Sequence, residues 1–168
     1  MKRVYLSLGS NMRNRLAALQ TAVDKLHRPD LRITKISSVY ETAPVDMKEQ
    51  PDFLNIAVEA ETSLFPMRLL RHIQNIERAM GRKRIVPKGP RVIDIDILLY
   101  GSSVVDTPQL QIPHPRMYDR RFVLEPLAEI ATNLRHLKEL LAAAPHQLVR
   151  RTMLRVTLML VIGAAVYA

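Results

Sequence analysis

The sequence lacks cysteine altogether, and none of its hydrophobic runs is long enough to cross a bilayer. Without cysteine the chain can form neither a disulfide framework nor a thiolate metal site. This absence suits a reducing compartment, and we expect the protein to be cytoplasmic. Residues 1–11 combine two basic residues with an apolar stretch that is too short for a secretory signal. We therefore interpret this start as a first strand.

The longest apolar run lies at residues 156–168, behind Arg150, Arg151 and Arg155. It is shorter than the roughly 18–20 residues that span a membrane. We expect a buried or frayed terminal helix and no membrane partner. A membrane-associated protein held by this tail is the alternative. The predicted division is one domain over residues 1–151 and a tail of unknown role over residues 152–168.

Aromatic residues are also scarce, at 5%, whereas basic residues are abundant and give a formal net charge of +9. A basic surface attracts polyanions, so nucleic acid, a membrane face and a nucleotide polyphosphate are all candidates. A basic RNA-binding module is one alternative, but the aromatic motif of an RNA-recognition sheet is missing. We therefore expect no nucleic-acid partner.

Hydrophobic periodicity predicts strands that alternate with helices in a chain of single-domain length, 168 residues. Strands are expected at residues 2–8, 31–40, 53–63 and 92–100, and helices at 15–26, 66–80, 121–130 and 137–144. Gly101 is expected to turn the strand at 92–100 back towards residues 104–105. This order predicts an α+β domain with helices on the faces of a mostly antiparallel sheet.

The strand at residues 92–100 carries two acidic residues on one face. Side chains alternate along a strand, which places Asp94 and Asp96 together, about 7 Å apart. The opposite face is expected to point into the core through Ile93, Ile95, Ile97 and Leu99. Paired carboxylates suit one or two magnesium ions whose shells are completed by substrate phosphates. Taken alone, the pair fits a solvated acidic face equally well.

A basic loop directly precedes this acidic strand, with Arg82, Lys83, Arg84, Lys88 and Arg91 inside ten residues. Guanidinium donors opposite a metal ion are what a transferring phosphate requires. A solvated loop would explain the basic residues by themselves. Their position beside the carboxylate pair favours phosphoryl-type transfer from ATP.

The usual nucleotide motifs do not occur: there is no P-loop and no protein-kinase catalytic loop. His114, between two prolines, is either a phosphate donor or a turn residue. Phe53 and Asn55 offer a stacking ring and an amide for a heterocycle, although a strand phenylalanine is usually part of the core.

Several motifs together resemble the 6-hydroxymethyl-7,8-dihydropterin pyrophosphokinase family of folate biosynthesis. The most specific is Gly89-Pro90-Arg91-Val92-Ile93-Asp94-Ile95-Asp96. The others, in family order, are Gly9-Ser10-Asn11, residues 40–44, residues 50–55, Glu77 with residues 81–84, Pro113-His114 and residues 120–122. The resemblance covers about residues 1–150 and ends before the tail.

This resemblance implies a ferredoxin-like fold, two magnesium ions, and transfer of pyrophosphate from ATP to the pterin hydroxymethyl group with release of AMP. We expect a monomer. The resemblance implies that Asp94 and Asp96 bind the metal and that Arg82 and Arg84 stabilise the transition state. It places the pterin at Thr42, Pro44, Val45, Phe53, Asn55 and Phe122. It places the nucleotide at Gln74, Glu77, Arg84, Arg91, Ile97, His114 and Arg120.

Three positions depart from residues found in some members of the family. Lys88 replaces a tryptophan that covers the site, Gln109 replaces an arginine, and Pro115 replaces a tyrosine. These changes bear on how the nucleotide is held and covered, not on the expected reaction.

Overall fold

The computed structural model describes residues 1–45, 49–82, 89–134, 136–145, 147, 149–152 and 154–156. Its elements in chain order are β1 (Lys2–Ser10), α1 (Arg15–Leu26), β2 (Leu31–Ile36), β3 (Tyr40–Thr42), β4 (Phe53–Thr62), α2 (Pro66–Ala79), β5 (Asp94–Tyr100), β6 (Val105–Asp106), β7 (Gln111–Ile112), α3 (Arg121–Ile130), α4 (Leu137–Ala143) and β8 (Val149–Arg151). All four predicted helices are present.

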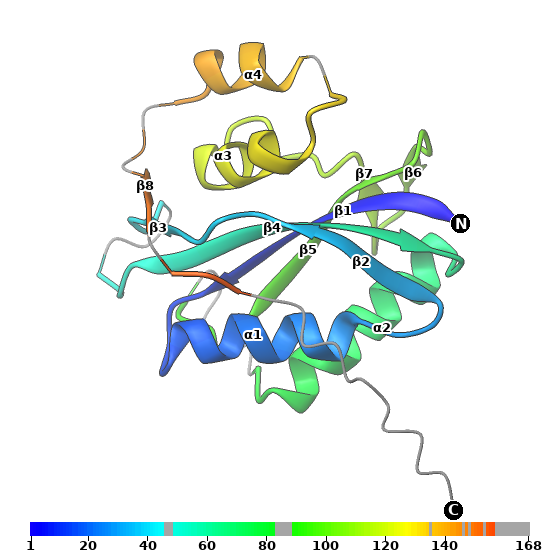
Figure 1. The fold of residues 1–168 in the computed structure, drawn as a ribbon, viewed down its shortest axis with the longest axis horizontal. Helices are drawn as coiled ribbons and strands as arrows, with labels where there is room; N and C mark the ends of the chain where they lie inside the picture. The colour runs from blue at the N-terminus through cyan, green and yellow to red at the C-terminus, as the bar shows by residue number, and fades with distance from the viewer. Residues whose placement is uncertain are drawn as a thin grey trace, which may run out of the picture.

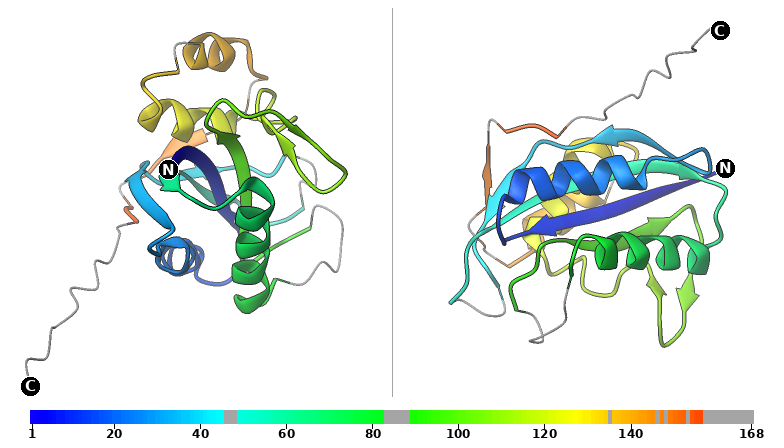
Figure 2. Two further views of the ribbon diagram at one scale, coloured as in Figure 1. Left: turned by 90° about the vertical axis from the view of Figure 1, so that its right-hand side faces the viewer. Right: turned by 90° about the horizontal axis from the view of Figure 1, so that it is seen from below.

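The main sheet has the order β5-β1-β4-β3-β8, and β2 pairs with the remaining part of the β4 edge. Every pairing in it is antiparallel. Figure 1 shows α1 and α2 on one face of this sheet and α3 and α4 on the other, and Figure 2 shows α1 and α2 side by side. The predicted α+β, ferredoxin-like arrangement is confirmed.

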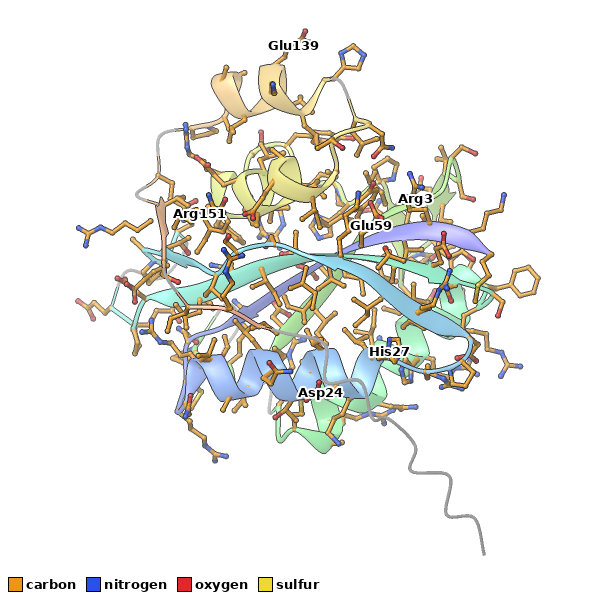
Figure 3. All side chains as sticks on the ribbon, viewed as in Figure 1. Arg3, Asp24, His27, Glu59, Glu139 and Arg151 are labelled. Atoms are coloured by element: carbon orange, nitrogen blue, oxygen red, sulfur yellow. The ribbon has the colours of Figure 1, made fainter. Side chains whose placement is uncertain are left out.

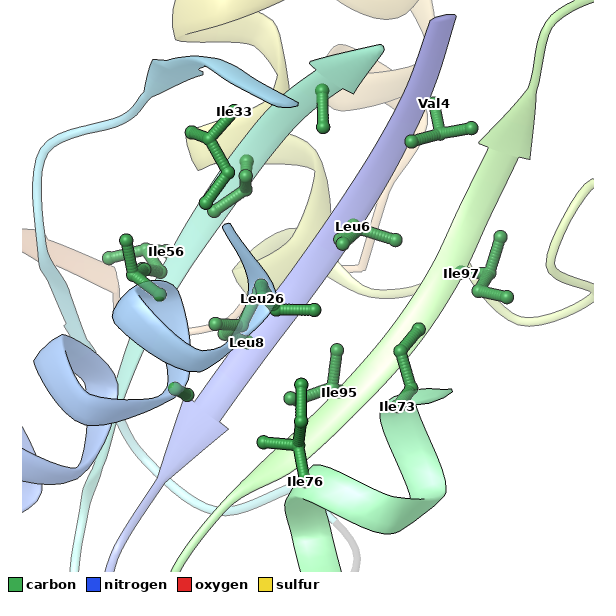
Figure 4. Close-up of a cluster of buried hydrophobic side chains, with 14 of the residues drawn as sticks. Val4, Leu6, Leu8, Leu26, Ile33, Ile56, Ile73, Ile76, Ile95 and Ile97 are labelled. Carbon is green, nitrogen blue, oxygen red and sulfur yellow. The ribbon is translucent and has the colours of Figure 1, made fainter. Parts of the chain in front are cut away.

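The larger core lies between the sheet and helices α1 and α2 (Figure 4). Alternate residues of β1, Val4, Leu6 and Leu8, are fully buried there because side chains of a strand alternate between faces. Ile73 and Ile76 of α2 meet this surface at helical spacing. Sequence periodicity therefore predicts correctly which face of β1 and of α2 is buried.

A smaller core lies under α3 and shows where strict alternation fails. Tyr5 pairs with Leu99, but the next residue, Leu6, pairs with Ile97, so Leu98 is an extra residue on β5. Such a bulge shifts the alternation. Leu98 and Leu99 consequently both pack under α3, while Tyr100 returns to the larger core. The prediction that Leu99 points the same way as Ile97 is wrong for this reason.

Three features of the strands also differ from the prediction. The strand expected at residues 31–40 is two strands, because the Ser37 hydroxyl accepts the Ala57 amide and interrupts the ladder between β2 and β3. The strand expected at 92–100 begins at Asp94. Residues 104–105 do not pair with β5, since β6 pairs with β7 in a separate two-stranded sheet.

Two polar networks fasten α3 to the sheet. Glu59, labelled in Figure 3, has a 6% exposed side chain that accepts hydrogen bonds from Tyr5 and Thr34. Glu129 of α3 accepts hydrogen bonds from the Ser38 amide and the Tyr40 hydroxyl. Lys35 joins the first network to the helix, since it pairs with Glu59 and donates to the carbonyl of Ile130. Both networks therefore tie the C-terminal end of α3 to strands of the sheet.

The chain after β8 returns to the sheet. Thr152 donates from its amide and its hydroxyl to the carbonyl of Val39. Val156 is 5% exposed and packs in the larger core, although residues 157–168 lie outside the described part of the chain. Among the helices that the structure describes, none is long and apolar enough to cross a membrane.

Candidate active site

One row of residues crosses three neighbouring strands at the end of the sheet nearest the start of α3. Gly9 of β1 pairs with Asn55 of β4 on one side and with Asp94 of β5 on the other. Directly paired residues project to the same face. Two strand spacings separate Asn55 from Asp94, which is about 10 Å.

Gly9 leaves the middle of this row open. A Cβ atom there would lie 2.8 Å from Oδ1 of Asn55 and 3.8 Å from the Phe53 ring. The first distance is shorter than a van der Waals contact, so a side chain at Gly9 would displace Asn55. The glycine therefore creates the space between the strand that carries the amide and the strand that carries the carboxylates.

Asp94 is held by two arginines. Nη2 of Arg82 lies 2.8 Å from Oδ1, and Nη1 of Arg91 lies 2.6 Å from Oδ2. Arg82 also forms an ion pair with Glu77, whose side chain is 7% exposed. Burial raises the pKa of Glu77, and the charge of Arg82 opposes this rise. Glu77 further accepts the Ile95 amide at 2.9 Å, which fixes Arg82 against β5.

Asp96 is the next acidic residue on the same face of β5. Loss of hydration among the surrounding protein atoms, and then the charge of the Asp94 carboxylate, raise the pKa of Asp96 to about 6. His114 Nε2 lies 3.9 Å away, and burial followed by the charge of Arg120 lowers the pKa of this histidine. A histidine that favours the neutral state does little to offset two neighbouring carboxylates. The charges of Arg120 and Arg82 oppose the rise in the pKa of Asp96, but they do not cancel it.

These two carboxylates are hard oxygen donors and suit magnesium. In the described part of the chain no group of three or more His, Cys, Asp or Glu side chains comes together as a complete metal site. A cation here would take the rest of its shell from water and substrate oxygens. This is how magnesium is usually bound where phosphates are substrates.

A pocket of about 400 Å³ opens between α2, β5 and the β6–β7 hairpin. Both aspartates and Arg82 line it. Four residues predicted for the nucleotide also do so: Gln74, Glu77, Ile97 and His114. Gln109 and Pro115, two of the positions that depart from the family pattern, are in its wall as well.

Arg91 and Arg120, also predicted for the nucleotide, lie beside the pocket instead of lining it. The guanidinium of Arg91 is 5.6 Å from the centre of the Phe53 ring, and that of Arg120 is 5.4 Å from the centre of the Phe122 ring. Both arginines therefore lie against the rings predicted for the pterin, and Arg91 also contacts Asp94 in the pocket wall. The predictions for Arg84 and Lys88 fall on residues 83–88, outside the described part of the chain.

The residues predicted for the pterin come from three segments. Asn55 Nδ2 donates to Oγ1 of Thr42 at 2.8 Å, and both residues are buried. Pro44 and Phe122 are partly exposed, whereas Val45 is 53% exposed. The structure thus brings Thr42 and Asn55 together and leaves Val45 largely in solvent.

Asn11 has a role that sequence reasoning did not assign. Its Oδ1 accepts the Arg91 amide at 2.8 Å, and its Nδ2 donates to the Pro51 carbonyl at 3.1 Å. It therefore ties the segment before β5 to the segment before β4. The only signal in the sequence was the motif Gly9-Ser10-Asn11, which spans the end of β1 and the residue after it, and the partners of Asn11 are far along the chain.

Comparison with known proteins identifies the family. The sequence model described as 7,8-dihydro-6-hydroxymethylpterin-pyrophosphokinase (HPPK) matches residues 5–132. A 2-amino-4-hydroxy-6-hydroxymethyldihydropteridine pyrophosphokinase of Bacillus subtilis is 52% identical over 127 residues, 75% of this chain and 76% of the relative. The enzyme of the same name from Pseudomonas aeruginosa is 41% identical over 157 residues, 90% of this chain and 97% of the relative.

Longer proteins contain the same region. A folic acid synthesis protein of Pneumocystis carinii is 43% identical over 79% of this chain, which spans 18% of that relative. A crystal structure of Plasmodium falciparum HPPK-DHPS with pteroate matches with a TM-score of 0.68, covering 84% of this chain and 42% of that one. At 18% identity this likeness shows the fold. The sequence-based prediction of the family and of its enzyme class is confirmed, and the chain belongs to the 7,8-dihydro-6-hydroxymethylpterin-pyrophosphokinase family.

Proposed function

We propose that the chain transfers pyrophosphate from ATP to the hydroxymethyl group of 6-hydroxymethyl-7,8-dihydropterin, producing AMP and the pterin diphosphate. The observation that carries this proposal is the row Asn55, Gly9 and Asp94, which aligns an amide for a heterocycle with a carboxylate for a metal ion. The gap of about 10 Å between the outer strands accommodates the reacting groups of the two substrates.

The pterin is held by Thr42, Pro44, Val45, Phe53, Asn55 and Phe122. Asn55 is oriented by its bond to Thr42, so its amide is fixed before the substrate arrives. A site that hydrogen-bonds a heterocycle rejects analogues that leave its buried polar groups unpaired. The ring would lie between Phe53 and Phe122, which come from the sheet and from α3.

The nucleotide occupies the pocket beside β5. Gln74, Glu77, Ile97 and His114 line this pocket. Arg91 and Arg120 lie against the two rings, where they would bind phosphate oxygens near the point of transfer. Arg82 and Arg84 neutralise the charge that develops on the transferring group.

Asp94 and Asp96 would hold two magnesium ions. When bound, these ions neutralise the phosphate charge and orient the phosphates for in-line displacement. The aspartates are suited to the task because both line the pocket and, among the residues that the structure describes, they are not part of a group of three or more metal-binding side chains that would complete the shell without substrate.

No side chain has to act as a nucleophile. The pterin hydroxyl oxygen attacks the β-phosphorus and gives its proton to water. The bond from that phosphorus to the oxygen bridging the α-phosphate breaks, and AMP leaves with that oxygen. The work of the protein is alignment and charge neutralisation.

A coupled assay of AMP release tests this function. AMP should appear only when ATP, magnesium and the hydroxymethyl pterin are all present. ATP turnover without the pterin, or none with it, would contradict the proposal. We expect a cytoplasmic monomer that uses neither nucleic acid nor a membrane, and sedimentation at working concentration checks the oligomeric state.

A further inference from the structure

We propose that Gln147 is a positioning residue that fixes the distance between the two sides of the pterin site. The inference rests on the proposed function, since the two sides are those assigned to the pterin above. Gln147 belongs to none of the motifs that carry the family resemblance.

The amide of Gln147 bonds to both sides at once. Its Nε2 donates to the carbonyl of Ala43 at 2.9 Å, and its Oε1 accepts the amide of Phe122 at 3.2 Å. Ala43 stands between Thr42 and Pro44, two of the proposed pterin residues. Phe122 is the proposed stacking ring on the opposite side. One side chain therefore links segments that are 104 and 25 residues away from it in the sequence.

The bond to Phe122 satisfies a backbone amide in the first turn of helix α3. The first amides of a helix have no partner inside the helix and carry partial positive charge. Arg120, at the N-cap position of α3, makes no side-chain capping bond. The Oε1 atom of Gln147 supplies an acceptor from outside the helix, which fixes the first turn and with it the backbone of Phe122.

The bond to Ala43 is possible because strand β8 holds Gln147 beside strand β3. Thr42 pairs with Val149, so Gln147 comes from a segment that already lies beside β3. Arg151, labelled in Figure 3, adds a bond from Nε to Oγ of Ser38 at 2.9 Å. These contacts hold the backbone near Gln147 independently of its side chain, so replacing the side chain should not detach β8.

A binding site whose sides are already at the correct distance loses less freedom when the ligand enters. Without the Gln147 bonds, α3 would still pack on the sheet through Val123, Leu124 and Leu127. Its first turn, however, would have to be ordered by the pterin itself. The expected consequence is a selective loss of pterin affinity.

Three variants test this. Gln147→Leu removes both bonds at similar volume, and Gln147→Glu keeps an acceptor for Phe122 but removes the donor to Ala43. Thr152→Val is the matched control, since it removes a bond from the same segment to Val39 that touches neither side of the site. Calorimetry gives Kd for the pterin with a non-hydrolysable ATP analogue present and, separately, Kd for the analogue.

Gln147→Leu should raise the pterin Kd by about tenfold, and Gln147→Glu should raise it less, because the glutamate keeps the acceptor for the Phe122 amide. The analogue Kd should stay within about twofold, and Thr152→Val should leave both within about twofold. An unchanged pterin Kd in Gln147→Leu, an equal loss for both ligands, or an equal loss in Thr152→Val would overturn the inference.

Amide hydrogen exchange at Phe122 tests the bond without any substrate. Exchange should be faster in Gln147→Leu than in the wild type and Gln147→Glu, and equal rates in all three would overturn the inference. A wild type that releases no AMP would instead contradict the proposed function. The two failures are therefore distinguishable.

Discussion

Arg82 forms an ion pair with Asp94, with Nη2 2.8 Å from Oδ1. An arginine that we propose to stabilise the transition state is therefore in direct contact with a proposed metal ligand. Arg91 covers the other oxygen of the same carboxylate at 2.6 Å. Metal binding at Asp94 must therefore compete with two guanidinium groups. Release of Arg82 from Asp94 would free it for the transferring phosphate, which links metal loading to placement of the arginine.

Replacing Arg82 should affect turnover more than ground-state binding. We expect Arg82→Ala to lower kcat by at least about tenfold, about 1.4 kcal/mol, with little change in pterin affinity, because its contact favours the transition state. Manganese binding without nucleotide, followed by electron paramagnetic resonance, should become tighter. Arg78→Ala is the control, since Arg78 bonds to exposed Asn75 on the same helix. A loss entirely in ground-state binding would contradict the role of Arg82.

Asp96 should be essential for turnover but not for folding. Asp96→Asn is expected to remove nearly all magnesium-dependent activity, because one of the two hard oxygen ligands is lost. The metal-free variant should be no less stable than the wild type, because the repulsion from Asp94 is removed. Asp24→Asn on the outer face of α1 is the control. Near-normal activity in Asp96→Asn would contradict the metal assignment.

Because the pKa of Asp96 is raised in the folded protein, its contribution to the stability of the metal-free protein should decrease as the pH rises. Folding raises this pKa to about 6, so the contribution of the carboxyl to stability is complete below its unfolded pKa and is lost as pH rises through about 6. Carboxyl NMR of the metal-free protein should show Asp96 titrating near that pH. Magnesium with nucleotide should move the titration lower, and Asp94→Asn should do the same. An ordinary Asp96 titration in the metal-free wild type would contradict the interpretation.

The sequence predicted most of the fold because its signals are local. The alternation in β1 and β5 and the helical spacing in α2 are readable from neighbouring residues. The bulge at Leu98 was not predictable, since it arises from the pairing of β5 with β1. The same holds for the division of residues 31–40, which depends on the Ser37 hydroxyl bonding to Ala57.

The residues of the candidate site that belong to sequence motifs could be predicted, but those outside the motifs could not. Asp94 and Asp96 stood out because two acids on one face of a strand are unusual. Gln147 did not stand out, and Asn11 was named only within the motif Gly9-Ser10-Asn11, because each acts through partners that only the folded chain brings near it. Nothing in the sequence marks such bridging amides, so the proposed pterin residues could be named while the groups that hold them could not.

Gly9 should tolerate no side chain. In Gly9→Ala the new Cβ would lie 2.8 Å from Oδ1 of Asn55, so Asn55 must turn away and lose its bond to Thr42. We expect the pterin Kd to rise by at least about tenfold, since a buried polar group is left unpaired. Ser10→Ala on the same strand is the control: its buried hydroxyl has no hydrogen-bond partner among the described residues. Unchanged pterin affinity in Gly9→Ala would show that Asn55 does not orient the substrate.

The last prediction concerns the C-terminal tail, which lies beyond every motif of the family. Truncation after Arg151 removes the Thr152 bonds to Val39 and the buried Val156, but no proposed site residue. Burying a valine is worth about 1.5–3 kcal/mol, so Tm should fall by several degrees. Both KM values and kcat should stay within about threefold, roughly 0.7 kcal/mol. Truncation after Val156 keeps these contacts and should therefore have a higher Tm than truncation after Arg151. If instead the shorter chain folds but cannot bind pterin, the tail completes the site and the predicted boundary at residue 151 is wrong.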